Sequence, residues 1–128
     1  MKLIGSGCEC KVYEIDQLLV LKAYKDKSVR DNAFNRQKKA FTLGIAPAVV
    51  RRKAKIINFK KYYCYISERA DRPKTYTIYD SNKKRINDIK NIMKLMGLET
   101  FDVSYNNLGI CNNIIVCVDF GDMSVGKS

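Results

Sequence analysis

Apolar and polar residues alternate along the first part of the chain. Residues 10–15, Cys-Lys-Val-Tyr-Glu-Ile, alternate as a half-buried strand does, and residues 18–24 form a second, more apolar run. Asp16 and Gln17 lie between the two runs and suit a tight turn. We therefore predict an antiparallel hairpin, preceded by a glycine turn that starts near residue 3.

The spacing of apolar residues changes to that of a helix from Ser28 onward. Ser28 and Asp31 have the spacing of a capping box, with Asp in place of the preferred Glu or Gln. Gly44 is suited to end the helix, and Pro47 follows shortly after it. The predicted apolar stripe consists of Val29, Ala33, Phe34, Ala40 and Phe41.

Strands and a second helix are predicted in the rest of the chain. Residues 48–57 and 61–67 have the pattern of two strands, and the connector 68–80 contains Pro73. A helix is expected over 81–96, where apolar residues recur every three or four positions. These residues are Ile86, Ile89, Met93 and Met96.

The second helix should end at Gly97. Residues 98–121 are predicted to form a loop and then a strand pair, with Asn112-Asn113 in the turn and a buried strand over 114–118. This order of elements predicts an α+β fold.

Composition narrows the class of protein. A length of 128 residues suits one domain, and 46% of the residues are apolar. No apolar run approaches the roughly 18 to 20 residues that span a bilayer, and no secretory signal follows Met1, so we expect no membrane and a cytoplasmic location. The chain has five cysteines and no histidine, which disfavours a structural zinc site and excludes a His-based triad. The cysteines are expected to be reduced and buried.

The net charge of +11 favours an anionic partner, which could be a nucleotide, a nucleic acid or an acidic protein. The densest basic segments are residues 51–53, 60–61 and 83–85. We expect these segments to be solvated faces rather than a nucleic-acid groove.

Four short segments suggest phosphate and metal chemistry. The segment 5–12, Gly-Ser-Gly-Cys-Glu-Cys-Lys-Val, has glycines that allow close backbone approach to phosphates. Lys22 ends an apolar strand and can neutralise phosphate oxygens. The segment 102–107 starts with a carboxylate and ends with an amide that can reach Mg²⁺. Asp119, followed by Phe and Gly, can hold Mg²⁺ against a triphosphate. Each segment alone also fits an ordinary turn, strand or polar loop.

In this order the segments resemble the protein-kinase-like superfamily, closest to its small atypical and aminoglycoside-kinase-like branches. The segment 5–12 looks like the glycine-rich loop, Lys22 looks like the strand lysine, and 102–107 matches the catalytic-loop spacing Asp-x-x-x-x-Asn. Residues 107–121 are similar to the hairpin between the catalytic and metal loops, and 65–70 to the strand that enters the hinge.

The resemblance covers nearly the whole chain and implies its organisation. It implies an N-lobe over 1–67, a hinge over 68–80, a reduced C-lobe over 81–121 and a tail over 122–128. It also implies ATP and Mg²⁺ as cofactors.

Roles for individual residues follow from the same resemblance. Asp102 would be the catalytic base or orienting residue, with Lys22 also contributing to catalysis, while Asn107 and Asp119 would hold Mg²⁺. The nucleotide would meet Gly5, Ser6, Gly7, Val12, Lys22 and the backbone between Glu68 and Ala70.

The sequence departs from the family pattern in four places. Cys10 replaces the third loop glycine, and Thr100-Phe101 replaces the usual His-Arg. The predicted first helix has no glutamate, so Gln37 is the best candidate for the partner of Lys22 and would give a neutral hydrogen bond. Only seven residues follow Gly121, which leaves no activation segment and no helices for a protein substrate.

The last eight residues, 121–128, satisfy the P-loop pattern Gly-x-x-x-x-Gly-Lys-Ser. A P-loop works by opening a helix whose N-terminus binds phosphate, and no helix can follow Ser128 in this sequence. A polar tail is the better interpretation.

Three functions remain open. The first is a minimal ATP- and Mg²⁺-dependent phosphotransferase that acts on protein, because its phosphate, base and metal positions are all present. The second is a pseudokinase that binds and regulates a partner macromolecule. The third, less favoured, is a nucleic-acid binder that uses the basic residues and the eight tyrosines. Small lysine- and asparagine-rich chains of this kind resemble phage or viral products, which would place the protein in the host cytoplasm.

Overall fold

A computed structural model describes residues 1–7, 9–98 and 105–118. The fold is α+β, as predicted, and within these residues it contains a five-stranded antiparallel sheet, a two-stranded sheet and three α-helices. The elements in chain order are β1 (Lys2–Ser6), β2 (Cys10–Glu14), β3 (Leu19–Tyr24), α1 (Lys27–Thr42), β4 (Val49–Ile57), β5 (Lys60–Glu68), α2 (Thr77–Asp80), α3 (Lys83–Leu95), a 3-10 turn (Tyr105–Asn107), β6 (Leu108–Cys111) and β7 (Ile114–Cys117).

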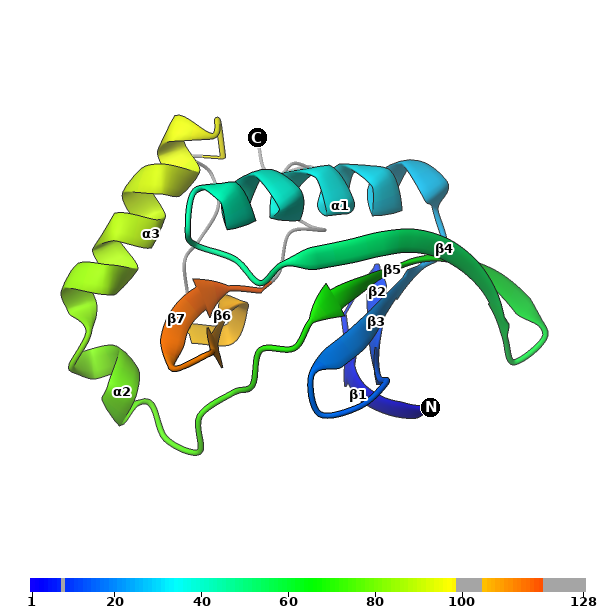
Figure 1. Cartoon of the computed structure of the whole chain (residues 1–128), viewed down its shortest axis with the longest axis horizontal. Coiled ribbons are helices and arrows are strands. Elements are labelled where there is room, and N and C mark those ends of the chain that lie inside the picture. Colours follow the sequence, from blue (N-terminus) through cyan, green and yellow to red (C-terminus); the bar gives the residue numbers. More distant parts are fainter. Residues whose placement is uncertain (8, 99–104, 119–128) are drawn as a thin grey trace.

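The large sheet has the strand order β1-β2-β3-β5-β4. The predicted hairpin is confirmed by β2 and β3, which pair from Cys10 opposite Tyr24 to Glu14 opposite Val20. The glycine turn is only partly confirmed, because Lys2–Ser6 form a strand, β1, that extends the sheet before the turn begins. Helix α1 lies along one face of this sheet, while α3 and the β6–β7 hairpin lie beyond its end (Figure 1).

Helix α1 begins two residues earlier than the capping-box prediction placed it. Asp26 is the N-cap, and its carboxylate accepts hydrogen bonds from the backbone N–H of Ser28 at 2.8 Å and of Val29 at 3.2 Å. The prediction of Ser28 as the cap was therefore wrong, because Asp26 offers a stronger acceptor two residues earlier. The hydroxyl of Ser28, which donates to the same carboxylate at 2.7 Å, and these backbone bonds hold the pKa of Asp26 below its usual value. The predicted stop is confirmed by Gly44, whose φ is +81°.

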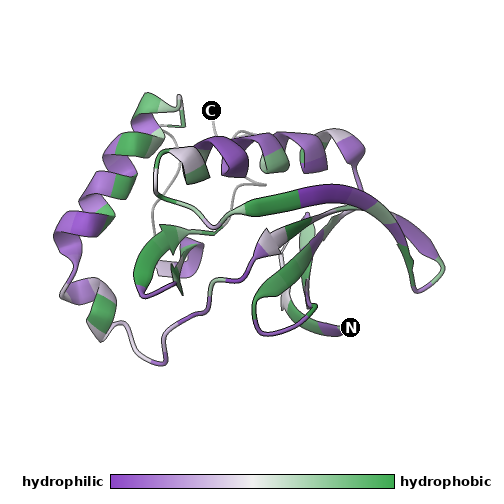
Figure 2. Ribbon diagram, in the orientation of Figure 1, coloured by the Kyte–Doolittle hydropathy of each residue, from purple (hydrophilic) through white to green (hydrophobic). Residues whose placement is uncertain are grey.

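The buried face of α1 differs from the predicted apolar stripe. Its buried residues, Arg30, Ala33, Gln37 and Ala40, follow the helical period and include two polar side chains. Phe41 was expected in the stripe but is 48% exposed, because it lies one residue beyond the buried line. The small side chains of Ala33 and Ala40 let the helix lie close to the sheet. Figure 2 shows that hydrophilic and hydrophobic residues are mixed along the helix.

Arg30 anchors α1 to β4 and β5. Its Nη1 donates to the carbonyl oxygen of Cys64 at 2.9 Å and to that of Lys53 at 3.1 Å. Its Nε contacts the carboxylate of Asp31 at 2.7 Å. A buried guanidinium with this many acceptors is compatible with the interior of the fold.

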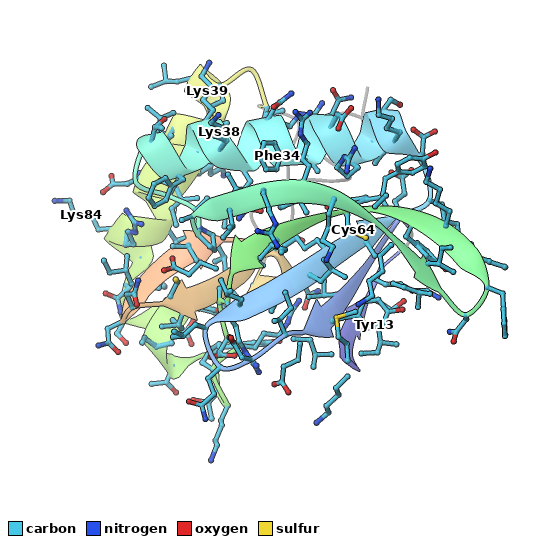
Figure 3. All side chains as sticks on the ribbon, turned by 45° about the vertical axis from the view of Figure 1, so that its right-hand side comes forward. Tyr13, Phe34, Lys38, Lys39, Cys64 and Lys84 are labelled. Atoms are coloured by element: carbon cyan, nitrogen blue, oxygen red, sulfur yellow. The ribbon has the colours of Figure 1, made fainter. Side chains whose placement is uncertain are left out.

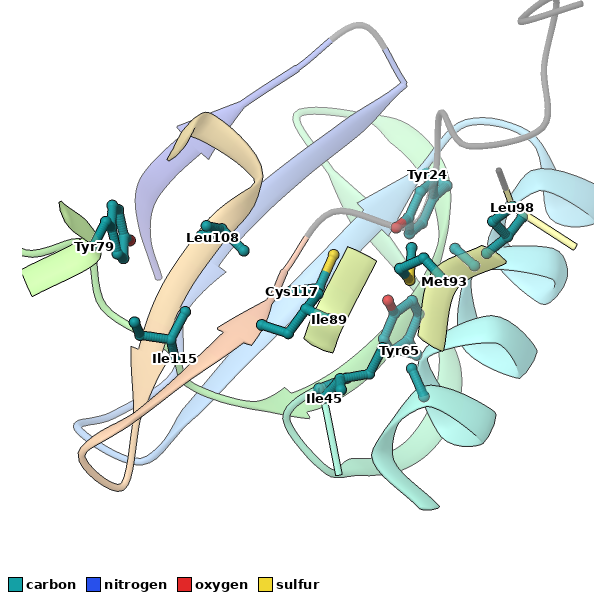
Figure 4. Close-up of a cluster of buried hydrophobic side chains, with 13 residues drawn as sticks. Tyr24, Ile45, Tyr65, Tyr79, Ile89, Met93, Leu98, Leu108, Ile115 and Cys117 are labelled. Atoms are coloured by element: carbon teal, nitrogen blue, oxygen red, sulfur yellow. The ribbon is translucent and has the colours of Figure 1, made fainter. Parts of the chain in front are cut away.

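One cluster of buried side chains joins the sheet, α1, α3 and the small hairpin (Figure 4). Tyr65 from β5 and Tyr24 from β3 stack with 6.0 Å between ring centroids. Ile89 and Met93 of α3 are buried, as the predicted periodicity requires, and Gly97 has the φ of +80° expected at the helix end.

The β6–β7 hairpin confirms the predicted strand pair. Asn112 and Asn113 have φ of 52° and 64°, the conformation of a type I′ turn, which Asn adopts more easily than most residues. The buried strand is confirmed except at its start, since Ile114 is exposed.

In the described part of the chain, no helix is long and apolar enough to cross a membrane. The cysteines described there are free, and Cys64, Cys111 and Cys117 are buried as expected. Cys10 is only partly buried.

Candidate functional site

A cleft of about 310 Å³ lies between the large sheet and the β6–β7 hairpin. Its lining comes from β1 to β3, from the connector after β5, and from the hairpin with the residue that follows it. The lining residues are Ile4, Gly5, Val12, Val20, Lys22, Pro47, Glu68 to Arg72, Leu108, Gly109 and Val118.

Lys22 places a buried ammonium group in this cleft. Alternation along β3 sends Leu21 and Ala23 to a cluster on the opposite face, while Lys22 faces the cleft and is 7% exposed. Its Nζ donates to Oε1 of Gln37 at 3.0 Å and to the carbonyl oxygen of Val118 at 2.8 Å. One cation therefore connects the sheet, α1 and the segment after β7.

The partner of Lys22 on α1 is Gln37, as the sequence predicts. Gln37 is fully buried, and its Oε1 also accepts from the hydroxyl of Tyr65 at 2.7 Å. Its Nε2 donates to the carbonyl oxygen of Pro47 at 2.9 Å and to Oγ of Ser67 at 2.7 Å. The amide oxygen accepts from the donors on one side and the amide nitrogen donates to the acceptors on the other. A glutamate at this position would place a second oxygen against the carbonyl of Pro47. The site is thus fitted to glutamine.

Tyr65 and Ser67 are two site residues that sequence reasoning missed as functional. They lie two residues apart on β5, so both point to the face that carries α1 and the cleft. Nζ of Lys22 lies 5.6 Å from the centroid of the Tyr65 ring. Burial, and then the neighbouring Tyr65, raises the pKa of Tyr24 far above its usual range, so this tyrosine stays neutral. The period-two pattern of residues 63, 65 and 67 could have identified the face.

The connector presents an unused backbone edge to the cleft. The N–H groups of Glu68 and Arg69 donate to the carbonyls of Ala48 and Leu18, each at 2.8 Å. Asp71 exchanges both backbone bonds with a residue of β6. Within the described residues, the N–H and C=O of Ala70 have no hydrogen-bond partner, and Ala70 lines the cleft. Ala70 therefore offers one donor and one acceptor to a ligand.

Glu68 contributes through its side chain as well as its backbone. Its Oε1 accepts a hydrogen bond from Sγ of Cys111 at 3.1 Å. Burial, together with this contact to Glu68, raises the pKa of the Cys111 thiol to about 12. The contact joins the end of β5 to β6 on one side of the cleft.

Gly109 allows the connector to pack against the hairpin, and the sequence did not single it out. A Cβ at this position would lie 3.0 Å from Cγ1 of Val118 and 3.1 Å from Cβ of Ala70. Any larger residue would push the hairpin away from Ala70 and widen the cleft. A glycine inside a short strand often marks such a close approach.

The predicted glycine-rich loop is divided between two hollows. Gly5 pairs with Val12 and lines the cleft with it. Gly7 accompanies Lys11 in a separate hollow of about 350 Å³, and its N–H donates to a backbone carbonyl across the turn. Ser6 is exposed and lines neither. The structure thus brings Gly5, Val12, Lys22, Glu68 and Ala70 together but leaves Ser6 and Gly7 outside the cleft.

The predicted metal and base residues are only partly described. Asn107 ends the 3-10 turn, and its carbonyl oxygen accepts from the N–H of Val118 at 2.9 Å. It therefore lies beside the residue that Lys22 contacts. Asp102 and Asp119 fall outside the described residues, as do Thr100-Phe101 and the tail 121–128.

Comparison with known proteins gives this site no external assignment: no protein-family model matches the chain, and no curated protein does.

Proposed function

We propose that the protein is a protein-kinase-like, ATP- and Mg²⁺-dependent phosphotransferase that acts on protein. The observation that carries the proposal is the buried Lys22, held between Gln37 and Val118 in a cleft that also presents the unpaired backbone of Ala70. A fixed cation and a free donor–acceptor pair are the two features that a purine nucleoside triphosphate needs.

The cleft suits a planar base on its connector side. Val12 and Val20 come from the large sheet and Leu108 comes from the β6–β7 hairpin, so both walls of the cleft carry apolar side chains. A purine edge with adjacent donor and acceptor complements the N–H and C=O of Ala70. The adenine-contacting role expected of residues 68–70 thus narrows to the backbone of Ala70.

The phosphates would then extend toward Lys22. An ammonium in a low-dielectric cleft attracts phosphate oxygens more strongly than one in water. To reach them, the lysine would exchange at least one of its bonds to Gln37 and Val118 for a phosphate oxygen. Gly5 leaves room for the phosphate chain beside Val12.

Magnesium binding remains a prediction from Asn107 and Asp119. In the described ranges no group of three His, Cys, Asp or Glu side chains could hold a metal ion. Bound Mg²⁺ would neutralise charge on the phosphates, and Asp102 would orient the acceptor hydroxyl or take its proton. The position of Asn107, next to the Lys22 contact at Val118, favours this arrangement.

A second candidate function is a nucleotide-responsive binding module without transfer activity. The contact that favours it is the hydrogen bond between Lys22 and Gln37, which takes the place of an ion pair with a carboxylate. Gln37 contributes no negative charge to hold the cation, and the carbonyl oxygen of Val118 accepts a second hydrogen bond from it. Under this hypothesis the protein would bind ATP and present a changed surface to a partner.

Phosphate transfer separates the two functions. The full chain is incubated with γ-labelled ATP, Mg²⁺ and an acceptor protein, alongside Asp102→Asn, Asp119→Asn and the control Asp88→Asn on the exposed face of α3. Transfer that is lost in the first two variants and kept in the control supports the phosphotransferase. ATP binding without transfer in any form supports the binding module, and no ATP binding at millimolar concentration overturns both.

A further inference from the structure

The β4–β5 hairpin carries a cluster of cations with no acid among them. Residues 49–67 contain Arg51, Arg52, Lys53, Lys55, Lys60 and Lys61, and no Asp or Glu occurs in that range. Arg52 contacts Asp31 of α1 at 3.4 Å. In the described part of the molecule, Arg51, Lys53 and Lys60 form no ion pair. This hairpin is therefore a source of the positive field, with little of it neutralised locally.

The far end of the hairpin projects beyond the sheet. β5 pairs with β3 only from Tyr63 onward, whereas its pairing with β4 continues to Ile57 opposite Lys60. Residues 56–61 therefore form the end of a two-stranded ribbon, which extends roughly 10 Å past the sheet at 3.4 Å per residue. At its base Tyr62 is buried in the core. Figure 1 shows this end of β4 and β5 standing away from the rest of the molecule.

An apolar side chain occupies the tip of the ribbon. Phe59 is 102% exposed, and nearby Ile56 is also largely exposed. Asn58 and Phe59 have φ of 51° and 67°, a turn in which the second position favours Gly. A bulky residue in this conformation is an uncommon and strained choice. The tip thus combines backbone strain with an apolar group in water, and folding explains neither.

Protection of a sheet edge accounts for only part of this pattern. β4 is an edge strand, and lysines on such a strand discourage pairing with other chains. A fully exposed Phe59 at the tip has the opposite effect, because an exposed apolar side chain favours association with other molecules whereas the lysines disfavour it. The combination is better explained by a partner that is anionic along its length and accepts a planar apolar group.

We propose that the β4–β5 hairpin is a binding arm for double-stranded DNA. Two-stranded ribbons bind DNA in the major or the minor groove, and apolar wedges are inserted from the minor groove, so we place the arm in the minor groove. Arg51 and Lys53 are exposed on one face, about 6.8 Å apart, and can follow a phosphate backbone. Lys55 continues the same row, with its Nζ 3.7 Å from Sδ of Met1. Phe59 at the tip can wedge between base pairs, as apolar side chains do in proteins that bend DNA.

Single-stranded nucleic acid and membranes fit the hairpin less well. A single-strand platform needs several open aromatic faces. Of the hairpin tyrosines, Tyr62 and Tyr65 are buried, and the partly buried ring of Tyr63 is covered by the cations of Arg30 and Lys61. A membrane anchor needs a broader apolar face than Phe59 and Ile56 provide. The inference does not rest on the proposed phosphotransferase, since the arm and the cleft lie at opposite ends of β5.

The test is a salt titration of duplex binding. Fluorescence anisotropy with a labelled 30-base-pair duplex is measured for the full chain without ATP. Non-specific binding near 10⁻⁶ to 10⁻⁴ M at physiological salt is expected, with a steep dependence on salt. Lys53→Ala combined with Lys60→Ala should lower the slope of log K against log salt by about 1.8, or 0.9 for each phosphate contact.

The matched control is Lys38→Ala with Lys39→Ala, which removes the same charge from exposed positions on α1 (Figure 3). It should leave the slope unchanged. Phe59→Gly should keep the fold but weaken duplex binding about tenfold, and it should abolish the fluorescence rise of a 2-aminopurine duplex that reports unstacking.

Three results would overturn the proposal. The first is equal loss of binding in the α1 control and the hairpin variant. The second is unchanged binding and unchanged unstacking in Phe59→Gly. The third is an absence of duplex binding at low salt, whether or not the chain binds phosphatidylserine vesicles or single strands.

Discussion

The two ends of strand β5 lie beside cations in opposite environments, one buried and hydrogen-bonded and the other exposed to solvent. At the cleft end, Ser67 and Tyr65 help to hold Gln37, which in turn holds the buried Lys22. At the other end, Lys60 is exposed to solvent without an ion pair among the described residues. Strand β5 thus helps to fix the buried cation of β3 at one end and carries an exposed cation of its own at the other.

The difference follows from solvation. Removing an ammonium from water is costly unless hydrogen-bond acceptors replace the lost hydration. Lys22 meets this requirement through Gln37 and Val118, and its position becomes fixed as a result. Lys60 keeps its hydration and needs no partner, so it contributes mainly a long-range field. A fixed cation suits one small ligand, whereas a field suits a long polyanion.

The largest predicted effect concerns the thiol at the cleft end. A pKa of about 12 for Cys111, against an ordinary value of 9.0, lowers the thiolate fraction at pH 8 about a thousandfold. Because a thiolate of higher pKa is also more nucleophilic, peptide mapping should find Cys111 alkylated by iodoacetamide about thirtyfold more slowly than in the urea-unfolded chain. Rapid alkylation of Cys111 in the folded protein would contradict the account.

The raised pKa of Cys111 also predicts how the stability of the fold changes with pH. Because the folded state holds the proton more tightly than the unfolded state, this contribution is complete below pH 9. It should decline as the pH rises from about 9 to about 12.

Gln37→Leu should cause the next largest change. It removes the acceptor that Tyr65 and Lys22 share and the donor to the carbonyl of Pro47, which should lower the free energy of unfolding by about 3 kcal/mol. Urea denaturation measures the loss. The control Asn35→Leu, exposed on the same helix, should change it by less than about 0.5 kcal/mol. A loss below about 1 kcal/mol in Gln37→Leu would mean that the network does not hold the site together.

At the opposite end of β5, substitution should have a smaller effect of opposite sign. Phe59→Gly relieves a backbone conformation with φ of 67° and removes an exposed apolar ring, so it should raise stability by up to about 1 kcal/mol. Thermal unfolding gives the sign. A clear loss of stability would show that Phe59 packs within the fold and would weaken the case for a DNA-binding arm.

The sequence predicted features that short-range rules control. Gly44 and Gly97 end helices because glycine adopts a positive φ easily, and Asn112-Asn113 forms the expected turn. Such features depend on a few neighbouring residues and can be derived from the chain alone. Gln37 was found differently, by counting back from Pro47 to the position that the family resemblance gives to the partner of Lys22.

Features that depend on tertiary packing were missed. Phe41 matched the apolar period, but the buried face is set by the polar anchors Arg30 and Gln37, whose partners lie on other strands. Gly109 is needed only because the connector crosses the hairpin at Ala70. The separation of Gly7 from the cleft likewise depends on how β1 and β2 pair.

The central claim is that Lys22 makes the cleft a nucleotide site. Calorimetric titration with MgATP tests it on the natural chain, on Lys22→Met and on Lys53→Met, which makes the same change at an exposed position of β4. We predict that Lys22→Met weakens binding at least tenfold while Lys53→Met binds as the natural chain does. Equal binding in all three forms, or no binding to the natural chain at millimolar ATP, would contradict the account.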